Sequence, residues 1–230
     1  MPALASLATL QITTATEQVF QTLYAAIISL ELAPGTKVSE AEIAKELGVS
    51  RQPVRDAFYR LSELGFLLIR PQRATTITYI SQQALRDARF IRTALETECL
   101  RAAIENVTPA DIAVLDALLD RQAAAIKSGD KLGFHELDDQ FHRKICEIAG
   151  HPNAWNMIRD QKVHLDRVRY LSLSFGAQSA LDDHIAIMKC IRAKDTQGAD
   201  AQMRMHLSRI LQILGQVSLE HAEYFESETE

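Results

Sequence analysis

The chain has 230 residues and a formal net charge of −5, with 47% hydrophobic and 24% charged residues. This composition excludes wholesale disorder, because disordered chains have too few apolar residues to form a core. The sequence also contains no run of about 18 uncharged apolar residues, the length that a membrane-crossing helix needs.

Short elements separated by turn residues fill the first 80 residues. Apolar residues recur there at helical spacing in three stretches, and two β-prone runs follow them. We expect helices at 15–31, 40–47 and 50–64, and strands at 66–70 and 75–79. Ser39 and Glu42 have the spacing of a capping box at the second helix, and Ser50 is placed to cap the third. This order of elements is that of a winged helix-turn-helix.

Few helix breakers follow Ser81, and the predicted class is mainly α. Helices are expected at 81–106, 109–127, 130–149, 152–174, 178–194 and 196–223. Thr108, Pro109 and Asp111 form a helix start signal, whereas Gly129, Gly150 and Gly176 mark expected joints. The predicted organisation is a tail at 1–13, a winged helix-turn-helix at 14–79, an all-α bundle of six or seven helices at 80–225, and an acidic tail at 226–230.

The three cysteines, Cys99, Cys146 and Cys190, lie far apart in predicted helices. An odd number without Cys-x-x-Cys spacing is unlike a disulfide framework or a cysteine zinc site. We interpret them as structural thiols in a reducing compartment. The opening residues lack the basic and apolar regions of a signal peptide, so we expect a cytoplasmic protein with no membrane partner.

Basic side chains gather at the start of the third predicted helix. Between positions 51 and 73 the chain has five arginines against two acidic residues. Arg51 and Arg55 are four residues apart and share one helix face, where a guanidinium group can contact guanine and Gln52 can contact adenine. An ordinary solvated arginine face is the alternative interpretation.

The motifs around this helix resemble a known DNA-binding domain. Residues 32–40, Ile43-Ala44, 47–57 and Arg60-Leu61 are similar to the GntR family of bacterial transcription regulators. The resemblance implies that Arg51 and Arg55, in the turn that also carries Ser50 and Gln52, are the principal DNA contacts. It also implies that 66–79 is the wing, with Arg73 at its tip. Family wings usually have Arg-Gly there, whereas this chain has Arg73-Ala74, and alanine tolerates a positive φ poorly.

Four polar residues fall on core-facing stripes of three predicted helices: Asp138, His142, His184 and His206. Asp138 and His142 are four residues apart, so their side chains converge on one point. A buried polar side chain needs a partner, and these side chains could be partners through a metal ion. Separate hydrogen-bonded core histidines are the alternative.

Residues 81–223 resemble the all-helical ligand-binding domain of the FadR branch of GntR regulators, often called the FCD domain. The resemblance rests on Arg92, Leu95-Glu96, Leu137-Asp138, Phe141-His142, Ala149-Gly150, Asp183-His184, Asp195, Ala199 and Met205-His206, in the family's order and spacing. In metal-binding members of the family, the positions of Asp138, His142, His184 and His206 hold one Asp and three His. His151 is interpreted as a turn residue, and His135, Asp139, His164 and His221 as surface or core.

Three histidines and one carboxylate suit Zn²⁺, Ni²⁺, Fe²⁺ or Mn²⁺, and an octahedral ion would keep two positions open for a small carboxylate effector. Arg92 is the candidate second anchor for that effector, because a guanidinium group pairs with a carboxylate. The alternative for Arg92 is a surface salt bridge with Glu96, four residues on.

The sequence thus predicts a ligand-responsive regulator that binds a palindromic DNA operator as a homodimer, and a small organic acid near a metal ion. A metal-dependent enzyme is the competing class, since such a site could activate water. We see no placed general base or nucleophile for that chemistry. In a third interpretation, the metal itself is the signal.

Overall fold

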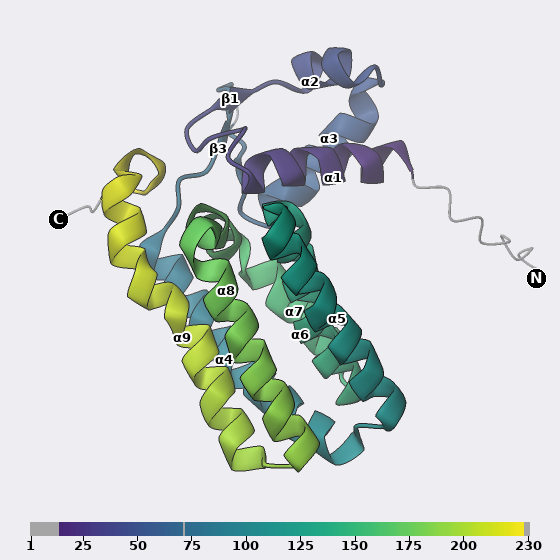
Figure 1. Ribbon diagram of the computed structural model, residues 1–230. Coiled ribbons are helices and arrows are strands. Elements are labelled where there is room, and N and C mark those ends of the chain that lie inside the picture. Colours follow the sequence, from purple (N-terminus) through teal and green to yellow (C-terminus); the bar gives the residue numbers. More distant parts are fainter. Residues whose placement is uncertain (1–13, 71, 228–230) are drawn as a thin grey trace, which may run out of the picture.

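The structure is a computed structural model that describes residues 14–70 and 72–227, and the side chains of all of these except 163 and 173–175. Within those residues the chain forms nine α-helices, one 3-10 helix and a three-stranded sheet (Figure 1). The predicted class, mainly α, is confirmed. None of the helices in this part of the chain is both long and apolar enough to cross a membrane. The tail expected at 1–13 and the last three residues of the acidic tail fall outside the described residues.

The first elements form a winged unit, which comprises α1 (Ala15–Ile28), β1 (Lys37–Val38), α2 (Glu40–Leu47), α3 (Arg51–Glu63), β2 (Leu67–Leu68) and β3 (Thr75–Ile77). The sheet has the order β1-β3-β2 and both pairs are antiparallel, with Lys37 opposite Thr76 and Leu67 opposite Ile77. The sequence did not indicate β1, because two residues are too few to show an alternating pattern. Apolar faces of α1 and α3 pack together in the core of this unit.

The turns of the winged unit follow the predicted signals in part. Gly48 ends α2 in the left-handed conformation, with φ of 66°, which glycine adopts without steric cost. Ser39 and Ser50 are the N-cap residues of α2 and α3, but neither side chain makes a capping hydrogen bond. The capping box expected for Ser39 and Glu42 is therefore wrong. A complete box forms instead at the start signal of a later helix, between Thr108 and Asp111.

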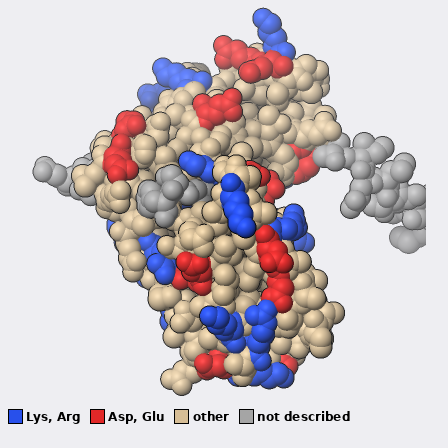
Figure 2. Space-filling view, in the orientation of Figure 1, with Lys and Arg blue, Asp and Glu red and all other residues tan. Residues whose placement is uncertain are grey.

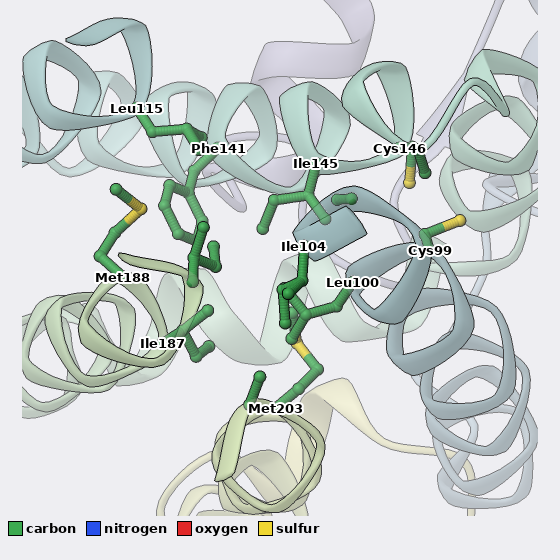
Figure 3. Close-up of a cluster of buried hydrophobic side chains, with 14 of the residues drawn as sticks. Cys99, Leu100, Ile104, Leu115, Phe141, Ile145, Cys146, Ile187, Met188 and Met203 are labelled. Carbon is green, nitrogen blue, oxygen red and sulfur yellow. The ribbon is translucent and has the colours of Figure 1, made fainter. Parts of the chain in front are cut away.

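The remaining elements form a helical unit, which comprises α4 (Gln82–Asn106), α5 (Pro109–Ser128), α6 (Lys131–Ile148), α7 (Pro152–Gln161), α8 (Val163–Ala193), α9 (Thr196–Glu220) and the 3-10 helix η1 (Ala222–Tyr224). The long helices run along one axis, and the winged unit lies across one end of the bundle (Figure 1). Apolar side chains of four helices meet in the centre, including Leu100 of α4, Ile145 of α6, Ile187 of α8 and Met203 of α9 (Figure 3).

The expected boundary between helices at 152–174 and 178–194 is wrong. Residues 163–193 form one helix that runs through Gly176, and the break lies earlier, at Lys162. One internal glycine costs only about 1 kcal/mol relative to alanine, which packing of α8 against α9 can offset. The Lys162 side chain is fully buried between the carboxylates of Asp139 and Asp166, a tertiary contact that hydrophobic periodicity does not indicate.

Arg167 of α8 joins the two units. Its buried guanidinium group donates to the backbone oxygens of Thr78, at 2.5 Å, and Tyr79, at 3.4 Å, just beyond the wing. The Nδ1 atom of His164 lies beside it, 3.0 Å from Arg167 Nη2, and accepts a hydrogen bond of 3.1 Å from the backbone N–H of Ser81. His164 is therefore neutral in this arrangement, with its proton on Nε2.

The contacts of Arg167 and His164 between the two units are expected to weaken in acid. Burial and the neighbouring charge of Arg167 lower the pKa of His164 to about 4. The stabilisation is complete above the unfolded pKa of about 6.5 and is lost as pH falls from there towards the folded pKa. The free energy of unfolding is measured by urea titration at pH 7 and at pH 4.5. Between these pH values it should fall by about 1–2 kcal/mol less in His164→Asn, which keeps a hydrogen-bond acceptor, than in wild type. Equal losses in the two proteins would contradict this assignment.

Candidate functional site

The four side chains predicted as metal ligands lie together in the helical unit. Asp138 and His142 come from α6, His184 from α8 and His206 from α9, and one ligand atom of each lies within 4.8 Å of all the others. The Nε2 atom of His206 is 3.2 Å from that of His142 and 3.4 Å from that of His184. All four residues are at least nine-tenths buried. The ring of Phe141 stacks on His184 at 4.5 Å and limits its rotation.

A second set of side chains orients the three imidazoles. Each Nδ1 faces a side-chain oxygen: His142 faces Glu96 at 2.6 Å, His184 faces Gln122 at 2.9 Å, and His206 faces Asp183 at 3.3 Å. The Gln122 amide oxygen and the Asp183 carboxylate accept hydrogen bonds, so these contacts place the protons of His184 and His206 on Nδ1. The Nδ1 atom of His142 lies close to Glu96 Oε2 but does not form a hydrogen bond with it in this structure. The Nε2 atoms of His184 and His206 are left with their lone pairs directed into the centre, which is how metal-bound histidines are held.

The centre fits a divalent cation. When the imidazoles are neutral and protonated on Nδ1, the lone pairs of their Nε2 atoms face one another and repel. A cation in the centre would accept these lone pairs and relieve the repulsion. Asp138 Oδ1 also points there, buried without a hydrogen-bond partner among the described residues. The cluster could therefore hold a metal ion through three nitrogens and one oxygen.

Electrostatics keep these groups in the protonation states that a metal needs. Burial lowers the pKa of His184 well below its usual value and also lowers that of His206, so both favour the neutral form. Burial acts to raise the pKa of Asp138, but Arg169 and the three histidines outweigh it and hold that pKa well below its ordinary value. The carboxylate is thus ionised and the imidazoles of His184 and His206 are neutral near pH 7.

A cavity of about 190 Å³ opens beside His206, between α4, α8 and α9. Arg92 lines it, as a residue that contacts an effector would have to. Its Nε atom is 2.6 Å from Glu96 Oε1, yet both side chains are buried, so this ion pair does not lie on the surface. The Nη2 atom of Arg92 is buried and has no hydrogen-bond partner in the described part of the chain. Arg92 therefore both supports the Glu96 carboxylate and presents a free donor.

The predicted DNA-contacting arginines are exposed at the N-terminal turn of α3. Side chains of Arg51 and Arg55 are 64% and 58% exposed, and both face Glu40 at the start of α2, with Arg55 Nη2 at 3.2 Å and Arg51 Nη2 at 3.8 Å from its Oε2. Gln52 donates to Asp56 at 2.7 Å. On the face shown in Figure 2, acidic and basic groups alternate over both units. Binding to DNA would therefore have to displace Glu40 from the two arginines.

The wing tip has its positive φ away from Ala74. Gln72, with φ of 57°, takes the left-handed conformation, whereas Ala74 does not. The alanine thus avoids the conformation that it tolerates poorly. Arg73 is exposed between these two residues.

Sequence comparison assigns both units to known families. Residues 15–77 match the bacterial regulatory proteins of the gntR family, and residues 87–209 match the FCD domain. The chain is a GntR-family transcriptional regulator. It is 35% identical over 214 residues to the HTH-type transcriptional repressor RspR of Escherichia coli (strain K12), covering 92% of this chain and 94% of that protein.

Solved structures of other proteins have the same fold as this regulator. E. coli McbR/YncC superposes with a TM-score of 0.76 at 25% identity, covering 88% of this chain and 98% of that one. A GntR regulator from Rhodococcus sp. RHA1 has the same fold, with a TM-score of 0.71 at 23% identity, over 87% of this chain and 97% of that one. The family and these relatives are transcriptional regulators, and the competing interpretation as an enzyme is not supported.

A buried polar chain in the regulator runs from the histidine cluster to the winged unit. Its members are Asp138, Arg169, Asp139, Lys162, Asp166 and Tyr24. Arg169 contacts the Asp138 carboxylate and lies 3.8 Å from Asp139. Lys162 Nζ bridges Asp139, at 2.8 Å, and Asp166, at 2.7 Å. Asp166 Oδ2 accepts a hydrogen bond of 3.1 Å from the Tyr24 hydroxyl of α1.

The sequence patterns do not indicate most of these supporting residues. They suggest Glu96 only as a partner of Arg92, and they suggest no role for Gln122, Asp183 or Arg169. Gln122 carried a usable signal, since it occupies a core-facing position of α5 where an uncharged amide needs a specific partner. Asp139, expected at the surface or in the core, is half-buried and belongs to the polar chain.

Proposed function

We propose that this regulator binds a palindromic operator as a homodimer and that a small carboxylate effector, bound beside a divalent metal ion, changes its affinity for DNA. The winged domain would span residues 14–79 and the helical domain residues 80–225, as a FadR-type regulator. The observation that carries the proposal is the convergence of three imidazoles beside a cavity that Arg92 lines. Zn²⁺, Ni²⁺, Fe²⁺ or Mn²⁺ suits this ligand set.

In this proposal Asp138, His142, His184 and His206 hold the ion, and Glu96, Gln122 and Asp183 keep the imidazoles aimed at it. When bound, the ion supplies positive charge and open coordination positions for the effector's carboxylate. Arg92 adds a charge-assisted hydrogen bond to the same carboxylate.

The buried polar chain supports a route from this site to α1 of the winged unit, which packs against α3. Arg169 contacts Asp138 and also lines the cavity. A metal ion on Asp138 therefore competes with the guanidinium group for the carboxylate, and an anion in the cavity competes with Asp138 for the guanidinium group. Two residues earlier, Arg167 is fixed to the backbone after the wing. The effector can shift the equilibrium only through its different affinity for two arrangements of these contacts.

Dimerisation follows from the operator geometry that helix-turn-helix proteins require, two half-sites about one helical turn apart. Large apolar side chains exposed on the helical unit, such as Phe90 of α4 (70% exposed) and Leu219 of α9 (85% exposed), support pairing through this unit. Light scattering at micromolar concentration should give twice the monomer mass, and a monomer would contradict the proposal.

The decisive experiment combines DNA selection with metal loading. Operator sequences are first selected from random DNA, and the affinity of the metal-free and Zn²⁺-loaded dimer for them is then measured with and without a panel of small carboxylates. The proposal expects a palindromic site whose affinity changes with a carboxylate only when the ion is present. If the metal itself is the signal, Zn²⁺ alone would produce the full change.

Removal of the Tyr24 hydroxyl should uncouple α1 from the histidine cluster. Tyr24→Phe deletes the hydrogen bond to Asp166, worth about 1.5–3 kcal/mol because one partner is charged. In hydrogen–deuterium exchange, Zn²⁺ should alter protection of both α6 and α1 in wild type, but only of α6 in the variant. Tyr59→Phe, which changes a tyrosine 62% exposed on α3, is the matched control. A Zn²⁺ effect on α1 that persists in Tyr24→Phe would show that this contact does not transmit it.

A further inference from the structure

The cavity beside His206 is richer in cations than one carboxylate requires. Four arginines line it, Arg89, Arg92, Arg169 and Arg209, with apolar contacts from residues that include Ile210 and Ile213. Four guanidinium groups around about 190 Å³ give a strongly positive interior.

Carboxylates of the protein compensate only part of this charge. Arg92 pairs with Glu96, Arg169 with Asp138, and Arg209 with Asp183. Arg89 forms no ion pair with any residue that the structure describes. Arg169 also lies 3.8 Å from Asp139, a carboxylate that it shares with Lys162. Arg89 therefore brings to the cavity a positive charge that none of these carboxylates pairs with.

Buried donors point to a second anionic group. Arg89 Nε, Arg92 Nη2 and Arg169 Nη1 are all buried and have no hydrogen-bond partner within residues 14–70 and 72–227. An unpaired buried donor on a charged group is costly, so three of them around one cavity indicate a ligand that accepts several hydrogen bonds. A single carboxylate that also coordinates a metal ion cannot satisfy all of them.

Helix geometry separates these donors into two levels. Arg89 lies three residues before Arg92 on α4, and Arg209 lies three residues after His206 on α9. α4 begins and α9 ends near the winged unit (Figure 1). Going from Arg92 back to Arg89, or from His206 on to Arg209, therefore leads towards the winged unit in both helices. Three residues rise about 4.5 Å along a helix. Arg89 and Arg209 therefore form an outer level, about one turn away from the inner level of Arg92 and His206.

We propose that the effector is an organic acid with a second anionic group, which Arg89 and Arg209 bind at the outer level. This inference rests on the proposed function, which places the first carboxylate at the ion and Arg92. The outer group is a carboxylate or a phosphate, and about two or three carbon atoms separate it from the first at this spacing. Ile210 and Ile213 contact the hydrocarbon between the two groups.

Matched acids test the charge requirement. Calorimetric titrations of the Zn²⁺-loaded full chain compare succinate with succinamate, which has the same length but a neutral amide in place of one carboxylate. Phosphoglycolate tests a phosphate as the outer group. We expect succinate or phosphoglycolate to bind about 10-fold or more tightly than succinamate. Equal affinity of succinate, phosphoglycolate and succinamate, or no binding by any of the three, would overturn the inference.

Two arginines of α4 provide the matched variants. Arg89→Gln should remove the advantage of the dianion and leave succinamate affinity unchanged. Arg86→Gln alters an exposed arginine that contacts Gln83 outside the cavity, and should change neither affinity. If Arg89→Gln weakens succinate and succinamate equally, Arg89 does not bind the second group. Failure of the proposed function itself is distinguishable, because Zn²⁺ binding and operator binding are measured without any acid.

Discussion

Replacement of His184 by alanine is expected to abolish tight binding of Zn²⁺ and to lower the melting temperature of the metal-loaded protein. The change removes one of four ligands and leaves Gln122 Oε1 without its partner in a fully buried position. An ion present at 100–1,000 times its dissociation constant stabilises the folded state by about 2.7–4.1 kcal/mol, and this contribution should disappear. Elemental analysis after dialysis and thermal unfolding with and without Zn²⁺ measure both effects.

Glu96→Gln is the graded control, because it preserves the shape of a supporting side chain and leaves all four ligands in place. Loss of such support typically costs about 10–100-fold in metal affinity, so the Zn²⁺ affinity of this variant should fall between those of wild type and His184→Ala.

Metal binding requires neutral imidazoles, and burial lowers the pKa of His184 and His206. Zn²⁺ binding should therefore persist somewhat below pH 6.5 and fail at lower pH. Unchanged Zn²⁺ affinity in His184→Ala would disprove the site.

Loss of Arg51 and Arg55 together is expected to eliminate operator recognition. Arg51→Ala alone should cost about 1–3 kcal/mol of binding free energy and relax sequence preference at one operator position. The double variant with Arg55→Ala should approach non-specific affinity, because both residues project from the turn that we expect to enter the major groove. Fluorescence anisotropy with operator and scrambled duplexes at one fixed salt concentration separates specific from non-specific binding.

Arg143→Ala is the control for this experiment, since it removes an exposed arginine of the helical unit that, among the residues described, pairs only with Glu147 of the same helix. That variant should bind the operator as wild type does. A folded double variant with wild-type affinity would show that α3 is not the recognition helix. Glu40→Gln should act in the opposite direction and strengthen DNA binding, because it releases the two arginines from their carboxylate partner.

Spacing along single helices predicts most of the helices and places Asp138, His142, His184 and His206 on the inner faces of theirs. That the four converge on one site is what the resemblance to the FCD domain implies, since the spacing alone also fits separate core histidines. The partners of the imidazoles, such as Glu96 and Gln122, could not be predicted because they lie on other helices. Their contacts depend on how those helices are oriented about their axes relative to α6 and α8. No periodic pattern contains that orientation.

Arg169 was overlooked for a different reason. The boundary expected near Gly176 assigned Arg169 to a different helix from His184, so nothing linked it to the cluster. The actual break at Lys162 is set by two carboxylates, one of them 23 residues earlier in the chain. Buried ion pairs between distant residues set this part of the fold, and only three-dimensional packing reveals them.

The order in which the chain is synthesised determines when the histidine cluster can bind an ion. Asp138 and His142 emerge first, whereas His206 follows His142 by 64 residues, on the last α-helix that the structure describes. An ion can be fully coordinated only after this final helix has docked, so metal capture would come last in the folding of a newly made subunit. The captured ion would then close a long loop, as a cross-link does, and disfavour reopening of the bundle. A cell short of the metal would accumulate subunits that are complete in sequence but lack this closure.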